Sequence, residues 1–288
     1  MLLVSASWAN DDPLAQLVRN DISNDARDAL VDRLKQADFA ATAQRILQLM
    51  HDGGAQHPGV YGEKPWRDKS LKHKDKVWYA ADEIWRGLVG GKPNPAKTAV
   101  LLELLARTKD EDSRYRVIMA LENHWTADVE RQFVELVNSE NTTDYVKLDL
   151  LRVLLRSCGD PYIDRAIQLV KSVSVESRGG YFRGLFNVAN RFFKYSQEHQ
   201  RDLIDLGFTI LETEAKDKDP HAAYFTACQL EYFLGDGKKF KPDQKAPQYQ
   251  GRYGLTDQFF ADTVQRVLEW RRANPGHQPE STAAPSSK

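Results

Sequence analysis

The stretch between residues 60 and 86 alternates large aromatic side chains with basic ones, a combination typical of surfaces that bind a partner. Its aromatic members are Tyr61, Trp66, Trp78, Tyr79 and Trp85, and its basic members include Lys64, Arg67, Lys69, Lys72 and Arg86. Trp78 and Trp85 are seven residues apart and share one helix face, so we assign them to the core. Tyr61, Trp66 and Arg67 lie in a loop and are our first candidates for partner contact, with packing in the core as the alternative for the two aromatic residues.

A second group of this kind surrounds residue 180. Arg178, Tyr181 and Arg183 lie close together in the chain there, interspersed with glycines. Glycine has no Cβ, so the backbone at such positions stays accessible to a partner that approaches closely. We expect Arg178, Tyr181 and Arg183 to form a second binding surface.

The segment Gly87–Pro93 has the glycines and the lysine of a phosphate-binding loop. Its spacing differs from that motif, and Pro93 stands where magnesium binding needs a hydroxyl group. We therefore interpret the segment as the end of one helix and the start of the next.

Metal and acid–base chemistry lack a suitable pattern as well. The histidines at positions 51, 57 and 73 do not have the four-residue spacing that places two metal ligands on one helix face. Two carboxylate groups, Asp82–Glu83 with Glu103 and Glu212 with Glu214, could divide acid and base roles, but acidic side chains also cover ordinary solvated helix faces. We predict no catalytic, cofactor-binding or metal-binding residue.

Charge is balanced along the whole chain, because 40 Lys and Arg face 41 Asp and Glu, a net charge of −1 at pH 7. Proteins that neutralise phosphates are normally basic, so nucleic acid is the weaker candidate partner. Cys158 and Cys228 fall in different helices about two repeats apart, and we expect both to be free, buried thiols. No apolar run reaches the roughly 18 residues of a membrane span, so we expect none.

Both ends of the chain differ from the rest. Residues 1–9 end in the small residues Ser7 and Ala9, as a signal peptidase site does, but they lack a basic start and a full apolar core. Two interpretations of residues 1–9 remain open. A signal-peptide remnant would indicate a secreted or periplasmic protein, and an ordinary N-terminus would fit a cytoplasmic one. Residues 274–288 are rich in Pro, Ser, Ala and Gln without periodicity, so we expect a disordered tail.

Amphipathic helices open at regular intervals through the middle of the chain. The openings begin at Asp75, Asp112, Asp144, Arg178 and Pro220, so the intervals are 37, 32, 34 and 42 residues. A repeat of this length is typical of a solenoid, in which each unit packs on its neighbours. Such architectures bind partners along extended surfaces, and the fold alone does not indicate a biochemical activity.

Two openings resemble a known family. Residues 112–121, Asp-Ser-Arg-Tyr-Arg-Val-Ile-Met-Ala-Leu, are similar to the Asp-x-x-Val-Arg-x-x-Ala opening of HEAT-like repeats, including their armadillo-type relatives, and residues 144–155 are a looser copy. The chain departs from the pattern at Tyr115, at Lys147 and at Gly179–Gly180. The resemblance covers about residues 75–235 and implies a right-handed α-solenoid whose concave side binds a partner, without a catalytic residue.

We therefore expect an all-α fold, a right-handed α-solenoid of HEAT-like helical hairpins with two long loop insertions. The expected order is a helical pair over residues 10–51, an irregular loop over 52–73, the repeat array over 74–235, a second insertion over 236–254 and a capping helix over 255–273. Within the array, we expect the fourth opening helix to begin at Tyr181, after the glycine pair.

Our leading hypothesis is a non-enzymatic scaffold that docks an unidentified protein or peptide on its concave face, without a cofactor. The alternative is a HEAT-like enzyme on nucleic acid, of the DNA alkylation-repair glycosylase type. The resemblance implies Trp and Asp side chains near the lesion in that case, and Trp125 with Asp128 is the local match. A third hypothesis is an extracytoplasmic accessory subunit of a larger complex.

Overall fold

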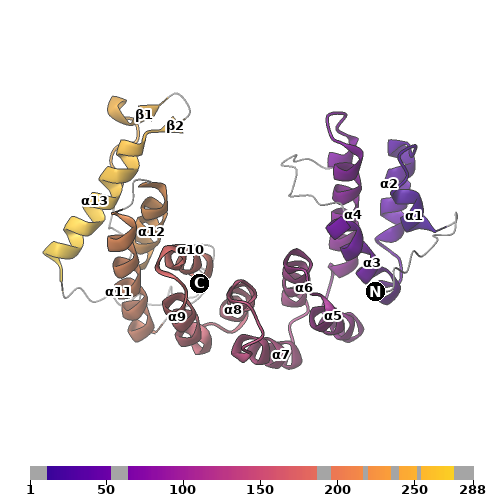
Figure 1. Ribbon diagram of the computed structural model, residues 1–288, viewed down its shortest axis with the longest axis horizontal. Coiled ribbons are helices and arrows are strands. Elements are labelled where there is room, and N and C mark those ends of the chain that lie inside the picture. Colours follow the sequence, from indigo (N-terminus) through magenta and orange to yellow (C-terminus); the bar gives the residue numbers. More distant parts are fainter. Residues whose placement is uncertain are drawn as a thin grey trace, which may run out of the picture. The chain divides into compact units, whose positions relative to one another are not determined.

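The computed structural model describes residues 12–52, 64–186, 196–216, 220–234, 240–251 and 254–275 (Figure 1). In these residues the chain forms thirteen α-helices, a few short 3-10 turns and one two-stranded hairpin, which confirms the expected all-α class. Residues 1–9, Tyr61 and most of the expected tail lie outside the described residues. None of the described helices has both the length and the apolar character that crossing a bilayer requires.

Contacts divide the chain into two compact units, residues 1–132 and 133–288. The division falls within helix α7 (Ala127–Asn138). Each unit has its own apolar core and is described separately.

Unit 1 is organised around helix α4 (His73–Val89). Helices α2 (Asn24–Leu34) and α3 (Phe39–Asp52) and the 3-10 turn η1 (Pro65–Arg67) all pack against it, and α1 (Pro13–Leu17) packs on α2. Helix α5 (Pro95–Arg107) packs on α6 (Glu111–Asn123), and α3 contacts both. Helix α4 is buried around most of its circumference, and Trp78 and Trp85 lie in the core as expected.

The helix starts follow the capping residues of the sequence. A side-chain oxygen accepts a hydrogen bond from a backbone N–H in the first turn of α2, α5, α6, α8 (Asp144–Cys158) and α11 (Gln197–Glu214). The capping residues are Ser23, Asn94, Asp110, Thr143 and Ser196. Each such cap contributes about 1 kcal/mol to the helix that it starts.

The glycine-rich segment after α4 is a helix end, as expected. Gly90 ends α4, and Gly91 has a positive φ of 97°. The fully buried His124 ties this turn to the end of α6, because its Nδ1 accepts from Asn94 N at 3.2 Å and its Nε2 lies 2.9 Å from Val89 O. The imidazole therefore acts as a structural bridge between these two segments.

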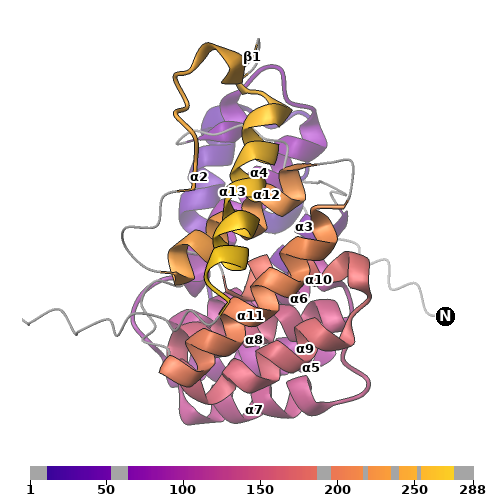
Figure 2. The same ribbon diagram turned by 90° about the vertical axis from the view of Figure 1, so that its left-hand side faces the viewer.

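Unit 2 consists of consecutive helical hairpins. Helix α8 packs on α9 (Ile163–Ser172), which follows the short turn η2 (Asp160–Tyr162), and on α10 (Val175–Leu185). Helix α10 also contacts α11 and α12 (Pro220–Phe233), and α12 lies along α13 (Asp257–Ala273), as Figure 2 shows. Each hairpin in this unit therefore contacts the next one.

Helix α10 corrects one expectation, because it begins at Val175 and not at Tyr181. The glycine pair lies inside the helix. Gly179 is buried against α11, and a Cβ at that position would overlap the carboxylate of Glu214. Close packing thus explains a glycine that looked like a helix break.

The second insertion contains ordered structure. A 3-10 turn η4 (Pro247–Tyr249) leads into the hairpin of β1 (Gln250–Gly251) and β2 (Gly254–Leu255). The buried Tyr249 donates a 2.7 Å hydrogen bond to Asp262 of α13, which fixes the hairpin to that helix. Cys158 and Cys228 are not joined by a disulfide, as expected, but both are partly buried and not fully buried as predicted.

Candidate functional site

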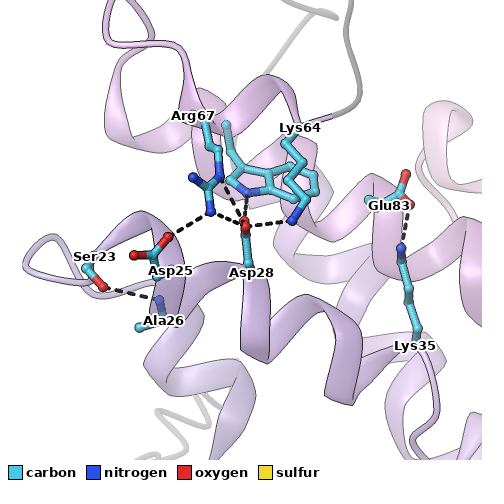
Figure 3. A network of polar contacts seen from close by, with 9 residues as sticks. Ser23, Asp25, Ala26, Asp28, Lys35, Lys64, Arg67 and Glu83 are labelled. Carbon is cyan, nitrogen blue, oxygen red and sulfur yellow. Dashed lines mark hydrogen bonds and ion pairs between the residues drawn. The ribbon is translucent and has the colours of Figure 1, made fainter.

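Two of the loop residues that we expected at a binding surface, Trp66 and Arg67, bind one carboxylate in unit 1, and Figure 3 shows Arg67 and Lys64 beside this carboxylate, Asp28. Asp28 of α2 accepts hydrogen bonds from Trp66 Nε1 at 2.7 Å, from Lys64 Nζ at 2.7 Å and from Arg67 Nε at 3.1 Å. Arg67 also donates to Asp25 Oδ1 at 2.8 Å. The segment that carries η1 is thereby attached to α2.

This network stabilises the charged form of Asp28. Burial of the carboxyl group opposes ionisation, but the hydrogen bonds from Arg67, Lys64 and Trp66 outweigh burial and lower the pKa of Asp28 to about 2. The carboxylate is therefore ionised and fully paired at neutral pH.

The network also decides what the loop offers to a partner. Trp66 is 2% exposed, so its ring lies in the interior and presents no surface to a partner. Arg67 keeps 45% of its side chain exposed but is already paired with two carboxylates. Partner contact by Arg67 stays a prediction, and Tyr61 lies outside the described residues.

In unit 2, Arg183 joins three helices. Its Nη1 donates to Glu214 Oε1 of α11 at 2.6 Å, and to Thr226 Oγ1 at 2.7 Å and Ala222 O at 3.1 Å, both in α12. Thr226 in turn donates to Glu214 Oε2 at 2.6 Å. This arginine therefore has a packing role in which its charge is compensated.

Arg178 lies at the start of the same helix. Its Nη2 donates to Lys171 O at 3.0 Å and its Nε to Val173 O at 3.4 Å, so it pairs with carbonyls at the end of α9. Tyr181 is partly exposed. The structure thus places Arg178, Tyr181 and Arg183 on one helix, and it uses both arginines to hold neighbouring helices.

A cluster that the sequence analysis missed lies on α4 and α6. Asp82 accepts from Arg116 Nη1 at 2.6 Å and also from Arg86, and the guanidinium carbon of Arg116 lies 5.0 Å from the ring centroid of Trp78. Asp82 and Trp78 are nearly buried, whereas Arg86 is 64% exposed. The spacing of these residues in the sequence could have indicated the cluster. Trp78 and Asp82 are four residues apart and so share a helix face, and Arg116 follows Asp82 by 34 residues, which is one repeat interval.

A second missed feature is the outer face of α12. His221, Phe225, Cys228 and Tyr232 follow one another at steps of four, three and four residues and therefore form one stripe. Phe225 is 57% exposed and Tyr232 38% exposed, while Ala223, Thr226, Ala227 and Leu230 are buried on the other sides of the helix. The ring of His221, at one end of the stripe, packs on Phe260 of α13 with 4.4 Å between ring centroids, whereas Phe225 and Tyr232 stay exposed. Large apolar side chains that are exposed together are typical of interaction surfaces.

The other chemical candidates lie apart or are already paired. Among the described residues no group of three or more His, Cys, Asp or Glu side chains is placed to hold a metal ion. His51 lies 3.4 Å from Asp110, His73 contacts Val18 O at 2.9 Å, and His57 is outside the described residues. Glu103 pairs with Arg107, and Asp128 pairs with Arg131 at 2.7 Å.

No family model, curated protein or solved structure matches this chain.

Proposed function

We propose that the chain is a non-enzymatic binding scaffold, a HEAT-like α-solenoid that docks a protein or peptide partner. Support comes from unit 2, where each of the hairpins α8/α9, α10/α11 and α12/α13 contacts the next. Arg183 strengthens this arrangement because it binds groups of α11 and α12 from α10. Stacked helical hairpins present a continuous surface, which is the usual basis of binding by such proteins.

The observation that carries the proposal is the aromatic stripe on α12. Burial of a Phe or Tyr side chain in an interface contributes roughly 1.5–3 kcal/mol, and aromatic residues dominate binding hot spots. Phe225 and Tyr232 are exposed in the free chain and are seven residues apart, so one partner surface can cover both. We place the docking surface on this stripe, while docking on a concave face stays a prediction.

A substitution pair tests the proposal. We expect the chain with Phe225→Ser and Tyr232→Ser to lose partners that the unchanged chain captures from its native source. Tyr115→Ser is the matched control, because Tyr115 is 38% exposed and lies in unit 1. Equal capture by the unchanged chain and the stripe variant would exclude α12 as the docking surface, and circular dichroism of both variants checks that the helices are retained.

The second candidate function is an enzyme acting on nucleic acid. One specific observation favours it: α4 and α6 bring an aromatic ring, a carboxylate and two guanidinium groups together at Trp78, Asp82, Arg86 and Arg116. Arg86 and Arg116 pair with Asp82, a second carboxylate, Glu83, lies 3.9 Å from Arg86, and Arg86 is exposed enough to meet a phosphate group. The balanced charge of the chain is the argument against it.

A gel-shift assay with duplex DNA separates the two candidates. If the cluster contacts phosphates, the chain shifts the duplex at low salt, the shift weakens steeply as salt rises, and Arg86→Gln reduces the salt dependence. Arg131→Gln is the control, since Arg131 is equally exposed and pairs with Asp128 outside the cluster. Absence of any shift at low salt removes this candidate.

A further inference from the structure

Unit 2 contains a groove on a different side of α12 from the aromatic stripe. It lies between the end of α11, the start of α12 and one face of α13, and its volume is about 470 Å³. Pro220, Ala223 and Leu268 contribute to an apolar floor. This volume lies within the range of about 300–1,000 Å³ typical of ligand pockets.

The ionisable side chains that described residues contribute to the groove all have the same sign. They are Glu214, Asp257 and Asp262, and no Lys, Arg or His of the described residues lines the groove. By contrast, two other hollows, both in unit 1, are lined by acidic and basic residues together.

Two of the three negative charges remain available to a partner. Glu214 is compensated by Arg183, 2.6 Å away. Asp262 accepts from Tyr249 at 2.7 Å and from Gln258 at 2.6 Å, but both donors are neutral and leave the charge in place. Asp257 is 79% exposed, and His221 lies 3.9 Å from it.

We propose that this groove receives a lysine or arginine side chain of a protein partner. The inference rests on the proposed scaffold function and adds the chemistry of the partner. The aliphatic stem of a long basic side chain packs on the apolar floor, and its charged end pairs with Asp257 and Asp262. An organic cation fits this groove better than a metal ion, because the described residues place no three potential ligands close enough to coordinate one.

Fluorescence anisotropy with the full chain tests the inference. The probe is a labelled nonapeptide of alternating Arg and Ala, and the reference peptide has Gln in place of Arg. We expect binding of the Arg peptide only, and about a tenfold or greater loss of affinity for the chain with Asp257→Asn and Asp262→Asn. The control carries Glu140→Gln and Glu212→Gln, two exposed acidic residues of the same unit that do not line the groove.

Three outcomes would overturn the inference. The first is that the Arg peptide does not bind at low salt. The second is that the groove variant and the control lose the same amount of affinity for the peptide. The third is that free arginine amide binds as tightly as the peptide, which would indicate a site for small cations. Asp257→Lys provides a second variant at an exposed position, so loss of folding does not obscure the result. Because capture through Phe225 and Tyr232 is measured separately, failure of the groove leaves the scaffold proposal standing, and the two failures can be told apart.

Discussion

The indole nitrogen of Trp66 donates a 2.7 Å hydrogen bond to the carboxylate of Asp28, which lies 38 residues earlier in the chain. This bond connects the 3-10 turn η1 to helix α2, and the Trp66 ring is buried there. Lys64 and Arg67 complete the pairing of the same carboxylate. Residues with the composition of a binding surface therefore stabilise the fold of unit 1.

The first prediction concerns the stability of this network. Asp28→Asn removes the negative charge that pairs with Lys64 and Arg67, and we expect a loss of about 2 kcal/mol in the free energy of unfolding. Urea denaturation of both chains measures this difference in the free energy of unfolding. Asp32→Asn, an exposed change in the same helix, should stay within about 0.5 kcal/mol of the unchanged chain. Equal stability of both variants would contradict a structural role for the network.

The second prediction concerns acid sensitivity. The pKa of Asp28 is lowered from 3.8 to about 2 in the folded chain, so its ionised form stabilises the folded state. That contribution is present above the unfolded-state pKa and is lost as the pH falls from about 4 towards 2, and it amounts to about 2 kcal/mol. We expect the stability difference between the unchanged chain and Asp28→Asn to shrink over this range. A difference that does not vary with pH would contradict the pairing.

The third prediction concerns His199 at the start of α11. Its Nδ1 lies 3.0 Å from Asp160 and its Nε2 3.4 Å from Asp164, distances that indicate ion pairs. Burial opposes the charged imidazolium, but Asp160, Asp164 and Asp202 outweigh burial and raise the pKa of His199 above its usual 6.5. The resulting stabilisation is complete below pH 6.5 and is lost as the pH rises through the folded-state pKa.

Two measurements check this prediction. An NMR titration should place the His199 transition above pH 6.5, and His199→Gln should remove the corresponding pH dependence of stability. His51→Gln, which removes a more exposed imidazole in unit 1, is the control for the loss of a histidine. A transition of His199 at or below pH 6.5 would refute the assignment.

The fourth prediction compares two neighbouring glycines of α10. A Cβ at Gly179 would overlap Glu214 Oε1 and lie 2.7 Å from its Cδ, so Gly179→Ala displaces the carboxylate that binds Arg183. We expect a loss of about 1–3 kcal/mol. A Cβ at Gly180 would meet open space within 4 Å, so Gly180→Ala should stabilise the helix by about 0.5–1 kcal/mol. Thermal unfolding of the two variants shows whether the effects have opposite signs.

Local signals predicted many of the helices. In α5 (Pro95–Arg107), a proline in the first turn and an asparagine cap define the start of the helix within a few residues. The buried positions of Trp78 and Trp85 also followed from their spacing. The predicted start of α10 was wrong. Gly179 lies inside the helix, where close contact with α11 requires a glycine, and it does not mark a helix boundary.

The candidate sites were harder to predict because they depend on residues far apart in the chain. The sequence identified Trp66 and Arg67 as candidates for partner contact. The residue that both of them bind, Asp28, becomes apparent only in the folded chain. The cluster at Asp82 needs Arg116 from another helix in the same way. The exposed stripe of α12 is visible as a spacing, but its exposure depends on which sides of the helix α10, α11 and α13 cover.

By itself the sequence determined the helical class, most of the helix limits, the capping residues and the balanced charge, because these depend on composition and on interactions within one or two turns. Tertiary structure alone decided which polar side chains are paired, which aromatic rings stay exposed, and that one groove of unit 2 is lined, within the described chain, by acidic residues without a basic one. Those properties arise where helices distant in sequence pack together, and burial there changes both the accessibility and the charge state of each group.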